Sequence, residues 1–111
     1  MKKILLSLVV AFFTIISAQA LCINRTYYAY DDGKYFGKIE LKSDCSFTIS
    51  TVDGENFSGT YNINADVLEK GSQYQIVFNI SDGRTIKTQI LCPLQGKQCI
   101  ILDGFNFEAK S

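Results

Sequence analysis

Four cysteines and eleven carboxylates are the side chains of this sequence that could do chemistry, and no histidine accompanies them. Thiolates can attack a substrate or bind zinc, and paired carboxylates can serve as acid and base in glycoside hydrolysis. Histidine supplies the usual general base near neutral pH and the common partner of a serine or cysteine nucleophile. Because it is absent, we expect no enzyme, no cofactor and no metal centre.

The cysteines indicate cross-links rather than catalysis. Cys22, Cys45, Cys92 and Cys99 are separated by 23, 47 and 7 positions, which fits no zinc-binding pattern. An even number of cysteines in a small exported domain predicts two disulfides. Three connectivities are possible, and neighbours along the chain favour Cys22–Cys45 with Cys92–Cys99. The chain-entropy model assigns these loops about 3.5 and about 2.5 kcal/mol, a large part of the net stability of a small domain.

The carboxylates fall mostly in predicted turns or on the polar faces of predicted strands, where they are solvated. A catalytic carboxylate needs a desolvated cleft that shifts its pKa, and the sequence predicts none. The turn Asp53-Gly54-Glu55-Asn56 offers oxygen ligands but lacks the loop spacing of an EF-hand. A carboxylate-based hydrolase is therefore the least favoured function, and no calcium site is expected.

Aromatic residues near the start of the mature chain are the best candidates for binding. Tyr27, Tyr28 and Tyr30 lie close to Arg25, and Phe36 follows after a turn. Adjacent strand residues point to opposite faces, so one of Tyr27 and Tyr28 should be exposed. Tyrosine and arginine are enriched in binding hot spots, although aromatic side chains also fill sheets well. The candidate binding surface comprises Arg25, Tyr28, Tyr30 and Phe36.

Residues 1–20 have the pattern of a secretory signal peptide. A cationic start at Lys2 and Lys3 precedes the apolar run Ile4–Ile16 and the small-x-small site at residues 18–20. We expect cleavage after Ala20, which leaves 21–111 as a single secreted β domain in the periplasm or outside the cell. The apolar run is shorter than the roughly 20 residues of a membrane span, so no stable membrane insertion is expected after cleavage. A retained anchor and lipid attachment at Cys22 are the alternatives.

Charge excludes one class of partner. Lysine and arginine together equal aspartate and glutamate in number, at eleven each, and two of the basic residues lie in the predicted leader. The mature part is therefore slightly acidic and has no basic stripe. We expect no nucleic-acid binding and no polybasic attachment to anionic membranes.

The mature sequence alternates apolar and polar residues almost throughout, which predicts antiparallel strands with one buried face. Asp-Gly occurs four times between alternating runs and suits tight hairpin turns. A short extra strand near Val67-Leu68 is also possible. The fold class is all-β: a small antiparallel up-and-down meander of about eight strands, closed into a barrel or folded as a two-layer sandwich with two disulfides. The predicted strands are 23–30, 34–42, 45–52, 57–63, 73–80, 84–92, 97–102 and 105–109.

The alternation also predicts which side chains face inward. The set is rich in large side chains that can fill a small barrel, so a sizeable ligand cavity is not implied. The predicted core residues are Tyr35, Ile39, Leu41, Phe47, Ile49, Phe57, Tyr61, Ile63, Ile76, Phe78, Ile80, Ile86, Ile90, Ile100, Phe105 and Phe107.

In architecture, the predicted meander resembles small lipocalin-like or lysozyme-inhibitor-like periplasmic β-barrels, and no motif of either family transfers a functional residue. We expect a non-catalytic exported domain that binds a protein or a surface glycan, like an inhibitor or an adhesion module. A small-ligand carrier of lipocalin-like architecture is the alternative. Asn24, Asn56 and Asn79 match the glycosylation pattern, which has meaning only in a eukaryotic secretory route. The sequence leaves the partner, the host and the oligomeric state open.

Overall fold

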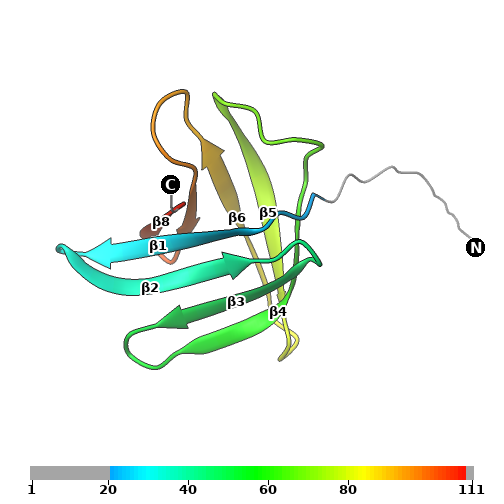
Figure 1. Cartoon of the computed structure of the whole chain (residues 1–111). Helices are drawn as coiled ribbons and strands as arrows, with labels where there is room; N and C mark the ends of the chain where they lie inside the picture. Colours follow the sequence, from blue (N-terminus) through cyan, green and yellow to red (C-terminus); the bar gives the residue numbers. More distant parts are fainter. Residues whose placement is uncertain (1–20, 110–111) are drawn as a thin grey trace, which may run out of the picture.

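A computed structural model describes residues 21–109, in which eight antiparallel strands close into a barrel in chain order (Figure 1). The predicted signal peptide, residues 1–20, lies outside the described residues. The all-β prediction is confirmed, and of the two predicted architectures the barrel is the one that forms. The strands are β1 Arg25–Asp31, β2 Lys34–Leu41, β3 Ser46–Thr51, β4 Asn56–Ile63, β5 Ser72–Ile80, β6 Thr85–Cys92, β7 Cys99–Leu102 and β8 Phe105–Ala109.

Each predicted strand forms, with small differences at the ends. The extra strand suggested near Val67-Leu68 does not form, and residues 64–71 are a connection. Leu21 makes an isolated antiparallel bridge with Ile63, the last residue of β4. Residues 21–109 contain no helix long and apolar enough to cross a membrane.

The four Asp-Gly turns gather at one end of the barrel. Because consecutive strands run in opposite directions, every second connection lies at the same end, here called the Asp-Gly end. Asp32-Gly33 and Asp103-Gly104 are two-residue turns in which both residues have positive φ, as a type I′ hairpin requires. The connections 42–45, 64–71 and 93–98 lie at the opposite end, here called the far end, together with the N-terminal segment (Figure 1).

The barrel interior is filled by large side chains. Five buried aromatic residues, Tyr27, Phe47, Tyr61, Phe78 and Phe107, pack with buried isoleucines and leucine. Phe47 meets Phe78 edge to face, with ring centroids 4.8 Å apart. Most of the predicted core is confirmed as fully buried. Tyr27 and several small residues were missed because they lie outside the strongest alternating runs: Ala29, Ala65, Cys92 and Ala109.

A bulge in β2 reverses the predicted orientation of Tyr35 and Phe36. Ala29 of β1 pairs with Gly37, but Tyr30 pairs with Tyr35, so Phe36 is the extra residue on its strand. An extra residue shifts the alternation by one. Tyr35 is therefore 41% exposed on the outer face, and Phe36 is half-buried against the core. The predictions that Tyr35 lies in the core and Phe36 at the surface are wrong for this reason.

The Cys22–Cys45 disulfide is confirmed and ties the N-terminal segment to the far end of the barrel. Tyr61 adds a second tie, because its hydroxyl accepts a 2.8 Å hydrogen bond from the Ile23 amide and lies 2.9 Å from the Lys42 carbonyl. A disulfide fits a protein that resides in an oxidising compartment.

The predicted Cys92–Cys99 disulfide is wrong, because both thiols are free. Leu91 pairs with Cys99 across β6 and β7, so Cys92 is one residue past that pair. Successive strand residues point to opposite faces. Cys92 is accordingly buried inside the barrel, whereas Cys99 is partly exposed outside. Closeness along the chain favoured this pair, but the pairing register separates the two side chains.

The β7–β8 hairpin is the least firmly joined part of the barrel. Only two residue pairs connect β6 to β7, and only two connect β1 to β8. By contrast, β5 and β6 share eight pairs. The strands of these two short pairings diverge toward the Asp-Gly end. There β1 and β8 both continue past their last shared residue pair.

Candidate functional site

A cavity of about 310 Å³ lies at the Asp-Gly end of the barrel. Its walls come from the inward-facing positions nearest the turns, beyond the point where the large core side chains end. Apolar and aromatic groups dominate the lining, and two carboxylates and a hydroxyl complete it. The lining residues are Phe36, Ile49, Thr51, Glu55, Phe57, Ile86, Leu102, Asp103, Phe105 and Phe107.

Two aromatic contacts set the shape of this cavity. Phe36, placed inward by the bulge, stacks on Phe105 of β8 with centroids 4.1 Å apart and planes at 12°. The stack therefore joins β2 to β8 on the inner side of β1, the strand that lies between them in the barrel. The second is at Phe57, where the Arg84 guanidinium lies over the ring, 5.1 Å from its centroid. The open end of the cavity is here called the mouth. The cavity is thus walled by half-buried aromatic side chains, with Phe36 and Phe105 stacked on each other and Arg84 over the Phe57 ring.

The rim of the cavity is acidic. The turns at this end and the residues beside them carry Asp31, Asp32, Asp53, Glu55, Asp82 and Asp103, against the cations Lys34 and Arg84. Arg84 forms an ion pair with Asp82 at 2.7 Å, and no other ion pair occurs among the described residues. The amide of Arg84 and its side chain donate to Asp82, which holds the pKa of that carboxyl below its usual value. The remaining rim carboxylates lack a salt-bridge partner.

Three tyrosines form a cluster on the outer wall beside this mouth. Tyr35 lies 6.4 Å from Tyr28 and 6.1 Å from Tyr30 between ring centroids, and Tyr30 is 61% exposed. A groove of about 420 Å³ follows the divergence of β1 and β8 and contains Tyr28, Tyr30 and Phe105. Phe105 also lines the cavity, so this groove and the cavity adjoin each other.

The structure brings together only part of the predicted binding surface. Tyr28 and Tyr30 lie side by side on the outer wall, joined by Tyr35. Phe36 faces the cavity instead. Arg25 lies at the far end, where its guanidinium donates a 2.7 Å hydrogen bond to Gln98.

Sequence reasoning missed the cavity itself. Phe57, Ile86 and Phe105 were interpreted as core, and each is only half-buried. A signal was present, because all three lie within three residues of an Asp-Gly turn. At such positions a barrel ends, and an inward side chain has neighbours on one side only.

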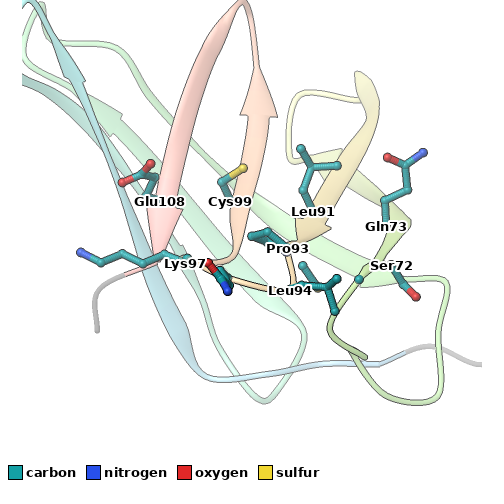
Figure 2. Close-up of a pocket in the computed structure, with 12 residues that line it drawn as sticks. Ser72, Gln73, Leu91, Pro93, Leu94, Lys97, Cys99 and Glu108 are labelled. Atoms are coloured by element: carbon teal, nitrogen blue, oxygen red, sulfur yellow. The ribbon is translucent and has the colours of Figure 1, made fainter.

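A second hollow, of about 680 Å³, lies at the far end on the outside of the barrel, next to the loop 93–98 (Figure 2). Leu91, Pro93 and Leu94 give it an apolar side, and Lys97 and Glu108 give it charges of both signs. Cys99 also lines it, and partial burial together with the charge of Glu108 raises the pKa of this thiol. A thiol with a raised pKa is a poor nucleophile, so this hollow carries no evident chemistry.

Asp44, at the far end, is held by local hydrogen bonds. Ser46 donates from both its hydroxyl and its amide to Asp44, which lowers the pKa of that carboxyl. Within residues 21–109, no group of three or more histidine, cysteine or acidic side chains is placed to hold a metal ion.

No protein family model, no curated protein and no solved structure matches this chain.

Proposed function

We propose that this chain is a non-catalytic exported binding domain that recognises a protein or a surface glycan with the Asp-Gly end of its barrel. The leader at residues 1–20 directs it to the periplasm or the exterior, with cleavage after Ala20. The Cys22–Cys45 disulfide supports an oxidising destination.

The observation that carries this proposal is the open, aromatic-walled cavity above a filled core. Half-buried aromatic faces at a concave site are the groups that binding surfaces favour. Phe57 lies in β4, which pairs with β3 and β5 over five residues each, so its ring loses little freedom when a partner binds. Hydrogen bonds from Arg84 lower the pKa of the rim carboxyl of Asp82, whereas a hydrolytic acid needs a raised pKa.

The filled interior also weighs against the carrier alternative. Lipocalin-like carriers need a deep cavity along the barrel axis, whereas Tyr27, Phe47 and Phe78 occupy the interior here. The mouth accepts one or two inserted side chains rather than an enclosed ligand.

The proposal is tested by nuclear magnetic resonance of the folded domain titrated with a neutral apolar probe, p-cresol. We expect saturable shifts of the Ile86 and Leu102 methyl groups, and much weaker shifts in Leu102→Asp, which places a charge in the mouth. Leu94→Asp, an exposed change at the far end, is the matched control. Shifts centred on Leu91 and Leu94 instead would assign binding to the far-end hollow and refute the proposal.

A further inference from the structure

We infer that the occupant of the mouth is an extended basic segment of a partner protein, anchored by an apolar side chain. This inference rests on the proposed function and names the partner of the same site. Three independent features of the Asp-Gly end support it: the size of the cavity, the sign of the rim charge, and the groove that adjoins the cavity.

The cavity fits an anchor residue. A volume of about 310 Å³ is at the small end of the range for ligand pockets, which is roughly 300–1,000 Å³. Phe36, Phe57 and Phe105 line it. A single large apolar side chain inserted there would be surrounded by rings, as anchor residues at protein interfaces are.

The carboxylates of the rim favour a positively charged partner. Six carboxylates occur at this end against two cations, and one of those cations is already paired with Asp82. The far-end connections 42–45, 64–71 and 93–98 carry acidic and basic residues in equal number. The chain is thus polarised, with its negative charge concentrated at the mouth, which steers a basic partner toward it and repels an acidic one.

A groove adjoins the cavity. Phe105 lines both hollows, and the groove also contains Tyr28 and Tyr30. This groove follows two strand edges that have separated, because β1 and β8 pair only at Tyr27 and Tyr28. An extended chain can lie along such a groove, contact the tyrosines and place one side chain in the cavity.

The test uses three short peptides with the same apolar centre, leucine–phenylalanine, flanked by lysines, by serines or by glutamates. Binding to the folded domain is measured by resonance shifts of the Ile86 and Leu102 methyl groups. We expect the lysine peptide to bind most tightly, the serine peptide less tightly and the glutamate peptide least. The differences in affinity among the three peptides should shrink at about 0.5 M salt, because exposed charges are then screened.

Matched charge variants show which carboxylates strengthen the binding of the lysine peptide. Glu55→Gln with Asp103→Asn removes two rim charges, and Asp66→Asn with Glu69→Gln removes two charges from the far-end connection 64–71. All four side chains are exposed, so both double variants should fold. The rim variant should weaken the lysine peptide about threefold to tenfold while leaving the serine peptide unchanged, and the far-end variant should change neither.

The outcomes separate this inference from the proposed function. Equal binding of all three peptides at the mouth would overturn the basic partner and leave the mouth as a binding site. Binding of a neutral oligosaccharide at the mouth, with no peptide binding, would replace the protein partner by a glycan. If no probe shifts the mouth resonances, both the inference and the proposed function fail.

Discussion

At the scale of single residues, Tyr61 joins three separate parts of the chain. Its hydroxyl contacts the backbone of Ile23 and Lys42 while its ring lies in the core. It therefore locks the disulfide-linked N-terminal segment onto the barrel. Burial raises the pKa of Tyr61, and it raises the pKa of Tyr27 strongly as well.

These two tyrosines predict how stability depends on pH. The folded state favours the neutral phenols, whereas the unfolded chain releases their protons near the ordinary pKa of about 10. Their contribution is therefore complete below pH ~10 and is lost as the pH rises above it. Urea unfolding between pH 8 and pH 11 should show the midpoint falling above pH 10.

Tyr61→Phe tests the same group directly. The variant should lose about 1–3 kcal/mol at pH 8, because the Ile23 amide loses a buried partner. Its deficit relative to the natural protein should shrink as the pH rises above 10. Tyr30→Phe, at a side chain that is 61% exposed, is the control. A deficit that stays constant over this pH range would contradict the assignment.

Cys99 and Glu108 give a second prediction at this scale. They are cross-strand partners on the outer face, and burial with the Glu108 charge raises the thiol pKa. Glu108→Gln should lower that pKa, so alkylation of the native protein by iodoacetamide at pH 8 should become faster. Glu69→Gln, which removes a charge elsewhere, should leave the rate unchanged. No difference between the two variants would show that Glu108 does not act on the thiol.

At the scale of the elements, the β7–β8 hairpin should open most easily. Two residue pairs hold it on each side, against eight between β5 and β6. Amide hydrogen exchange should therefore be faster in Ile101 and Asn106 than in Val77 and Gln89. A partner that fills the mouth should slow exchange in the hairpin, because Leu102 and Phe105 line the cavity. Uniform protection across all strands would contradict a weakly joined hairpin.

The strands could be predicted from the sequence because alternation and Asp-Gly turns are local patterns. The bulge at Phe36 could not, since it depends on how β1 pairs with β2. The same limit explains the wrong Cys92–Cys99 pair, because the register of β6 against β7 decides which face each thiol occupies. The cavity forms only once the sheet has closed, and its one local signal was the position of Phe57, Ile86 and Phe105 beside Asp-Gly turns.

In the whole molecule, the disulfide and the open cavity lie at opposite ends of the barrel. The far end holds the disulfide, the Leu21 bridge and the Tyr61 contacts. The opposite end holds the aromatic cavity, five carboxylates that lack a salt-bridge partner and the loosely joined hairpin. This division places the chemistry suited to recognition at one end and the covalent constraint at the other.

Site-specific photocrosslinking in the cells that produce this protein tests that division most directly. A benzophenone amino acid placed at Glu55 on the rim should form a covalent adduct with the partner, and the same group at Leu94 should not. Leu102→Asp should abolish the adduct formed from position 55 while the domain stays folded by circular dichroism. An adduct formed from Leu94 and not from Glu55 would contradict recognition at the Asp-Gly end.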